Sequence, residues 1–159
     1  MKRLFVIASV FFSWISSGHL APRVHILFLI DSKAGQVGDN IGPACNNNAA
    51  ALRGLFEQAL RPDQLKIRTV SGDDVNPEHV EWEIAGFRQE AAPHEAIFVY
   101  YCGHGSVRNG NEHIFGMAGG EISRQKIVDE MKKVPSRLQI LITDTCTSFE
   151  SPPIASEYS

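Results

Sequence analysis

Residues 96–106 read AIFVYYCGHGS and decide the fold. An apolar, β-rich run leads there into His104, which stands between two glycines. Residues 138–148 read LQILITDTCTS and repeat the pattern, with Cys146 after the apolar run. We therefore expect both side chains just past the C-terminal ends of buried strands, the edge of an open α/β sheet where ligands bind. A thiol and an imidazole at one edge are the parts of a nucleophilic hydrolase.

The rest of the chain alternates strand and helix patterns around these two stretches. Fully apolar or alternating runs predict strands, and apolar residues at helical spacing between caps and prolines predict helices. Asn109-Gly110 predicts a tight turn, within a small hairpin or an ordered loop. Residues 32–43 are expected to form a loop. The sequence thus predicts an α/β fold with a mostly parallel central sheet and helices on both faces. The expected strands are 24–30, 65–70, 96–101 and 138–143, and the expected helices are 46–60, 77–92 and 124–134.

Composition and the N-terminus indicate one exported globular domain. The chain has 159 residues and a net charge of −3, without a basic patch, which argues against a nucleic-acid partner. Lys2 and Arg3 precede the 12-residue apolar run 4–15, and 16–18 offers a small-residue cleavage site, so 1–18 is interpreted as a signal peptide. An uncleaved anchor or a buried strand are the alternatives, but 12 residues are too few for a membrane span. The domain would cover 22–150 with a tail at 151–159, in a periplasmic or extracellular location.

Three cysteines leave at least one thiol outside any internal disulfide. A bond between Cys45 and Cys102 would leave Cys146 free. The simpler interpretation is that Cys45 and Cys102 are small buried hydrophobic residues, as free cysteines usually are.

The chemistry of the two motifs favours covalent catalysis. A thiol is only weakly ionised at neutral pH, and an imidazole within hydrogen-bonding reach can accept its proton. The backbone N–H groups of Gly105 and Cys146 are candidates for an oxyanion hole. Taken singly, His104 could be an ordinary loop histidine, Cys146 a core cysteine and Asp144 a helix cap.

The motif Tyr-Tyr-Cys-Gly-His-Gly-Ser at 100–106, with Asp-Thr-Cys-Thr-Ser at 144–148, resembles the caspase-like cysteine peptidases, nearest to the metacaspase and bacterial caspase-like branch. Residues 44–49 are similar to that family's Gly-Cys-x-Asn-Asp-Ala motif. The resemblance covers about residues 24–148. It implies a three-layer caspase-like sandwich with a sheet of about six main strands and hydrolysis of peptide or protein substrates.

The resemblance assigns roles residue by residue. Cys146 matches the nucleophile, His104 the catalytic histidine and Gly105 the oxyanion donor. Asp144 matches the acidic residue that binds an arginine or lysine side chain before the cut bond. Asn48 stands where the family has an aspartate of the same substrate-binding pocket, so one negative charge is missing and the basic preference is weakened.

Two departures from the family shape the remaining expectations. The chain holds 13 residues after Cys146, too few for the family's C-terminal strands. Either it is a fragment, a partner completes it, or the pocket is incomplete, and we expect association through the last strand, 138–143. Many metacaspases need calcium, but no clustered aspartates of the kind that bind it lie between His104 and Cys146, so we expect no metal and no cofactor. The alternative functions are a non-catalytic caspase-like binding module and, more weakly, a flavodoxin-like domain.

Overall fold

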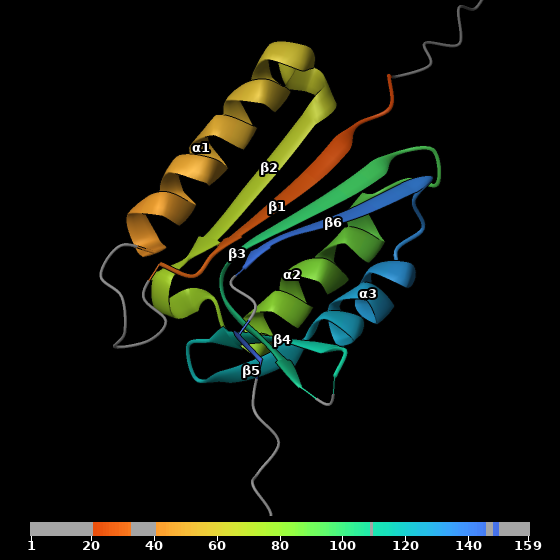
Figure 1. Ribbon diagram of the computed structural model, residues 1–159. Helices are drawn as coiled ribbons and strands as arrows, with labels where there is room; N and C mark the ends of the chain where they lie inside the picture. Colours follow the sequence, from red (N-terminus) through yellow and green to blue (C-terminus); the bar gives the residue numbers. More distant parts are fainter. Residues whose placement is uncertain (1–20, 33–40, 109, 146–147, 150–159) are drawn as a thin grey trace, which may run out of the picture.

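A mixed β-sheet with helices on both faces forms the fold (Figure 1). The computed structural model describes residues 21–32, 41–108, 110–145 and 148–149. Residues 1–20 and 150–159, with the expected signal peptide and tail, lie outside this description. In chain order the elements are β1 (Val24–Ile30), α1 (Ile41–Ala59), a 3₁₀ turn (Pro62–Gln64), β2 (Leu65–Ser71), a second 3₁₀ turn (Gly72–Asp74), α2 (Pro77–Glu90), β3 (Ala96–Arg108), β4 (Glu112–Met117), β5 (Gly120–Ser123), α3 (Arg124–Lys132), β6 (Leu138–Thr145) and β7 (Ser148–Phe149).

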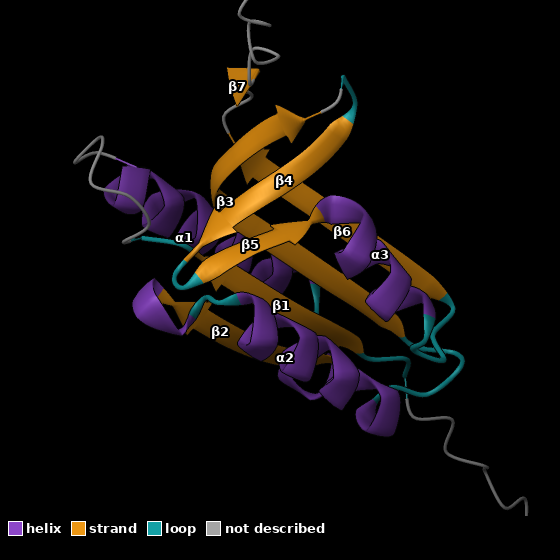
Figure 2. Ribbon diagram, turned by 90° about the horizontal axis from the view of Figure 1, so that it is seen from below, coloured by secondary structure: helices purple, strands orange, loops and turns teal. Residues whose placement is uncertain are grey.

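Four long strands pair in parallel, in the order β2-β1-β3-β6, and the two-residue strand β7 also pairs in parallel with β3. The four long strands start in register, because Val24 is the Cα partner of both Leu65 and Ala96, and Ala96 is also the partner of Leu138. Helix α1 covers one face, while α2 and α3 cover the other (Figure 2). The predicted α/β class and the helices on both faces are therefore confirmed.

The prediction of a mostly parallel sheet is wrong. Strand β3 runs on to Arg108, and its last five residues pair antiparallel with β4, which pairs antiparallel with β5. The two hairpin turns use Gly110 at φ 83° and Gly119 at φ 74°, a backbone region that favours glycine. The Asn109-Gly110 hairpin signal was thus correct, but the strand before it is seven residues longer than its apolar run indicated.

Local capping signals fix two of the three helices. The Asn76 side chain accepts a hydrogen bond from the His79 amide at 2.9 Å, and Ser123 accepts one from the Lys126 amide at 3.1 Å. Both helix starts were predicted. Helix α1 begins at Ile41, earlier than predicted, because Pro43 falls in the first turn, where a missing N–H costs no helical hydrogen bond.

The sheet separates two hydrophobic clusters. The cluster under α1 is the smaller one, and the cluster under α2 and α3 contains most of the larger side chains. Alternation along β3 explains the division, because Phe98 and Tyr100 face α1 while Val99 and Tyr101 face the other helices. The α1 cluster consists of Ile26, Phe28, Ile30, Cys45, Ala49, Phe98, Tyr100 and Cys102.

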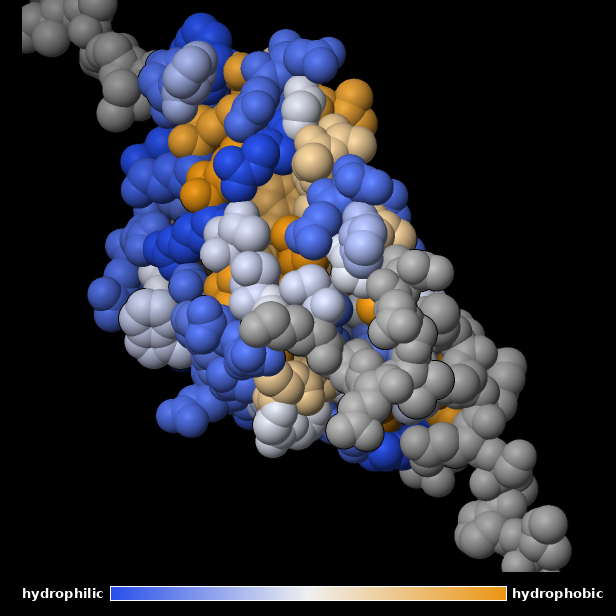
Figure 3. All heavy atoms as spheres, turned by 90° about the vertical axis from the view of Figure 1, so that its left-hand side faces the viewer, coloured by the Kyte–Doolittle hydropathy of each residue, from blue (hydrophilic) through white to orange (hydrophobic). Residues whose placement is uncertain are grey.

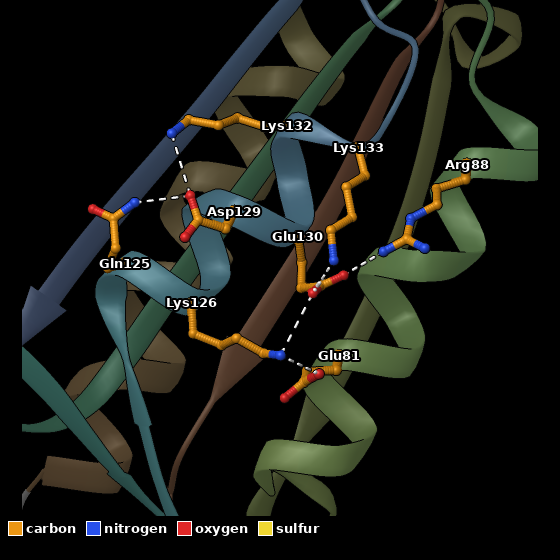
Figure 4. Close-up of polar contacts among 8 residues, drawn as sticks. All are labelled: Glu81, Arg88, Gln125, Lys126, Asp129, Glu130, Lys132 and Lys133. Atoms are coloured by element: carbon orange, nitrogen blue, oxygen red, sulfur yellow. Dashed lines mark hydrogen bonds and ion pairs between the residues drawn. The ribbon is translucent and has the colours of Figure 1, made fainter.

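Ion pairs join α2 to α3 on the opposite face (Figure 4). Glu130 is the centre of this network. It contacts Arg88 on α2 and, on its own helix and just past its end, Lys126 at 3.6 Å and Lys133 at 2.6 Å. The hydrogen bond from Lys133, with support from Arg88 and Lys126, lowers the pKa of Glu130 although partial burial opposes this. The network therefore links the two helices.

The surface on the α1 side and the surface of the edge strand β6 differ in hydropathy. Viewed from the side where α1 lies in Figure 1, the surface is mostly hydrophilic, with hydrophobic side chains visible between charged ones (Figure 3). Strand β6 is different, because Leu138, Ile140 and Ile142 are 52, 37 and 41% exposed. Among the described residues no helix is long and apolar enough to cross a bilayer.

Candidate active site

The connections between the strands change faces at β1. Strand β1 lies between β2 and β3, and the chain leaves β1 through α1 on one face but reaches β3 through α2 on the other. Such a reversal is a topological switch point, and the C-terminal strand ends beside it are the usual ligand site of α/β sheets. Asp31 follows β1 here, and Cys102 and His104 lie on β3.

His104 lies within β3, not in a loop after the strand as predicted. It is the first residue of β3 to pair with β4, and its Cα partner is Gly116. A Cβ added to Gly116 would lie 3.7 Å from the Cβ of His104. The residue paired with His104 therefore has no side chain next to the histidine. The Nε2 atom is buried and has no hydrogen-bond partner in the described part of the chain. The imidazole therefore retains a nitrogen for a further partner.

Tyr101 fixes the backbone that carries His104. Its buried hydroxyl lies 2.8 Å from the Gly116 carbonyl oxygen, 3.0 Å from that of His104 and 3.5 Å from Asp31 Oδ2, so its single proton has three acceptors within reach. Burial, with the neighbouring Asp31 carboxylate, raises the pKa of Tyr101 well above its usual value. A Cβ on Gly103 would come within 2.6 Å of this hydroxyl, which explains the glycine before the histidine.

The nucleophile candidate, Cys146, lies outside the described residues, as does Thr147, but Thr145 before them and Ser148 after them are described. Thr145 is the Cα partner of Gly103, and Ser148 is the Cα partner of Ser106. These two partners on β3 flank His104 and Gly105. The chain on either side of Cys146 is therefore held against the part of β3 that carries the histidine. Gly105 itself is paired with Phe115 of β4.

The structure brings Asp144 and Asn48 together. The Oδ2 atom of Asp144, at the end of β6, accepts a hydrogen bond from Nδ2 of Asn48 on α1 at 2.8 Å. The hydroxyl of Tyr100 donates to the same oxygen at 3.0 Å. Burial and this carboxylate raise the pKa of Tyr100 to about 12, so the phenol keeps its proton at any physiological pH.

A disulfide joins Cys45 of α1 to Cys102 of β3. The interpretation of these cysteines as free buried residues is therefore wrong, and the alternative bond is the one formed. Both residues are buried, at 1 and 3% exposure. Since the chain has three cysteines, Cys146 is the one left outside this bond.

Sequence reasoning missed Tyr100 and left the disulfide undecided. The period-2 alternation of β3 could have found Tyr100, because Tyr100, Cys102 and His104 follow at every second position and so share one face. Among the described residues, no three His, Cys, Asp or Glu side chains lie together in a group that could hold a metal ion.

Comparison with known proteins adds no assignment. No protein-family model matches the chain, and no curated protein gives a significant match to it. The arguments for a function therefore come from the fold and from the geometry at the switch point.

Proposed function

We propose that this protein is a caspase-like cysteine endopeptidase with Cys146 as nucleophile and His104 as general base and acid. One observation carries the proposal: the residues flanking Cys146 pair with the residues flanking His104-Gly105 at the switch point of the sheet. The finer assignment to a caspase-like three-layer sandwich belongs to the same proposal and rests on the two sequence motifs.

The proposed reaction follows from the residue types. His104 accepts the proton of the Cys146 thiol, and the thiolate attacks the scissile carbonyl carbon. The Gly105 and Cys146 amides stabilise the negative oxygen, and the imidazolium protonates the leaving amine. Water then hydrolyses the thioester with His104 as general base.

The substrate proposal rests on the acidic side chain at this edge. Asp144 would bind the arginine or lysine side chain that precedes the cut bond, and Asn48 would supply an uncharged second wall. Asp144 is exposed, and its position at the end of β6 puts it two residues before the nucleophile. The partner would thus be a peptide or protein with basic residues.

Export is part of the proposal, because disulfides persist mainly in oxidising compartments and the Cys45–Cys102 bond is consistent with such a compartment.

Association through β6 is also proposed. Its three exposed apolar side chains lie on one face, and no strand of the described chain pairs with it on the side away from β3.

A labelling experiment tests the dyad. With Cys45 and Cys102 bonded, iodoacetamide should alkylate Cys146 alone, and His104→Gln should slow this alkylation near neutral pH by about tenfold or more. His113→Gln is the matched control, because His113 is an exposed histidine on the adjacent strand β4. Hydrolysis of fluorogenic arginine peptides should be lost in His104→Gln and in Cys146→Ala and retained in the control.

The same experiment separates the second candidate, a non-catalytic peptide-binding module. The exposed outer side of β6 favours it, because the described residues supply no wall beyond that strand. Equal alkylation rates in the wild type and His104→Gln, with no hydrolysis in either, would establish that module and reject the peptidase.

A further inference from the structure

The two oxygens of Asp144 have different surroundings. Both donors near this carboxylate, Asn48 Nδ2 and the Tyr100 hydroxyl, bind to Oδ2. Oδ1 receives no hydrogen bond from the part of the chain that is described. The carboxylate is therefore oriented through one oxygen, and the other is left for a ligand.

The two donors are attached to the fold in different ways. The Tyr100 side chain is buried, and its ring packs edge-on against Phe28, with the centroids 5.8 Å apart. Asn48 lies on α1, one helical turn after Cys45, so it is on the same side of the helix as the disulfide. The Cys45–Cys102 bond fixes that turn of α1 to β3.

The disulfide also touches the carboxylate directly. Cys102 and Asp144 are Cα partners across β3 and β6, and the Cys102 Sγ atom lies 3.7 Å from Oδ2. A disulfide sulfur carries no proton and cannot donate to this oxygen. Oxidation therefore leaves Oδ2 to the two donors, Asn48 and Tyr100.

We propose that Tyr100 and the Cys45–Cys102 disulfide are positioning groups that aim Asp144 Oδ1 at a guanidinium or ammonium ligand. This rests on the proposed function, whose basic-side-chain subsite it deepens. Tyr100 acts through a hydrogen bond, and the disulfide acts by holding Asn48 and by denying Oδ2 a competing donor.

The redox state of the disulfide then controls the subsite. A dithiol breaks the Sγ–Sγ bond by giving two electrons and two protons to the cysteines, and it becomes a cyclic disulfide itself. The Cys102 thiol, now a weak donor next to Oδ2, competes with Asn48 for that oxygen. Helix α1 also loses its covalent link to β3, so cation binding weakens on reduction.

Benzamidine binding tests this without requiring catalysis. The full chain is titrated with benzamidine by calorimetry in the oxidised state and after reduction by a dithiol, with thiol alkylation and mass spectrometry confirming that the bond is open. The variants are Tyr100→Phe, which keeps the ring, and the pair Cys45→Ser with Cys102→Ser. Met131→Ala, a buried change in the opposite cluster, is the control for general destabilisation.

The expected result is a Kd raised about fivefold to tenfold by Tyr100→Phe, by the serine pair and by reduction, with no further effect of reduction on the serine pair. Asp144→Asn should abolish binding, and Met131→Ala should leave Kd unchanged while lowering Tm. Unchanged affinity in Tyr100→Phe, which decides the matter even if the serine pair does not fold, would overturn the proposal. So would benzamidine binding that is absent in the wild type or independent of Asp144.

A different experimental result would refute the peptidase proposal and leave the binding site in place. A chain that binds benzamidine through Asp144 but neither hydrolyses peptides nor shows histidine-dependent alkylation would refute the peptidase alone. The positioning roles of Tyr100 and the disulfide would then stand for a non-catalytic binding site.

Discussion

Glu95 should make the fold depend on acid pH through a single buried carboxylate. It lies just before β3, at the N-terminal ends of the parallel strands and so opposite the candidate site, and it is almost fully buried. Its oxygens accept hydrogen bonds from Arg23 Nε at 2.6 Å, His25 Nε2 at 2.8 Å and the Ala92 amide at 2.9 Å. Burial alone would raise the pKa of Glu95, but these three donors together lower it from 4.5 to about 2.

The sign and size follow by linkage. A carboxyl whose pKa is lower in the folded state stabilises the fold above its unfolded pKa, and that stability is lost as pH falls through the folded value. The shift from 4.5 to about 2 corresponds to about 3 kcal/mol. Solvent screening reduces this, since the side chain of Arg23 is 36% exposed. We expect about 1–2 kcal/mol of the free energy of unfolding to be lost between pH 7 and pH 3 through this group.

Urea unfolding of the wild type and Glu95→Gln at these two pH values measures the effect. The variant should be less stable than the wild type at pH 7, and the gap should shrink by about 1–2 kcal/mol at pH 3. Glu57→Gln, a change at an exposed glutamate of α1, controls for the loss of one carboxyl. If the gap between Glu95→Gln and the wild type is the same at both pH values, the linkage argument is refuted.

Three further outcomes are expected. Replacing both Cys45 and Cys102 by alanine should lower the free energy of unfolding in urea by about 4 kcal/mol, because the bond closes a sequence separation of 57 residues; a loss below about 1 kcal/mol would mean that the bond contributes little. Ile140→Lys on exposed β6 should reduce self-association in chromatography with light scattering, and a wild type that is wholly monomeric would contradict edge association. Asp144→Asn should lower kcat/KM for arginine and lysine peptides about a hundredfold; an aspartate peptide cut faster than these by the wild type would refute the basic specificity.

Local signals in the sequence were sufficient for most elements. The apolar run 24–30 and the capped starts at Asn76 and Ser123 have the predicted boundaries, because they depend on neighbouring residues only. The alternation of Leu65 to Val70 also predicted β2 within one residue. Strand order is a different matter, since it depends on which faces the helices cover and no local pattern encodes that choice.

The errors arose where tertiary pairing overrides local composition. Gly103, His104 and Gly105 look like a loop, but pairing with β4 and β6 draws them into β3. The meeting of Asn48 with Asp144, 96 residues apart, followed from the resemblance and not from local pattern. The disulfide was left open because connectivity depends on the distance between Cys45 and Cys102 in the fold, which sequence spacing does not give.

A thiol nucleophile and a disulfide in one chain are chemically compatible only if they do not exchange. Exchange requires a thiolate to reach a disulfide sulfur and attack it. Both Cys45 and Cys102 are buried between α1 and the sheet, so a thiol must open that contact before it can react. Burial therefore explains how this bond can persist in a protein whose proposed activity needs a reduced Cys146. Reduction of the native protein should accordingly be limited by the opening of α1, and its rate should stop rising as the dithiol concentration increases.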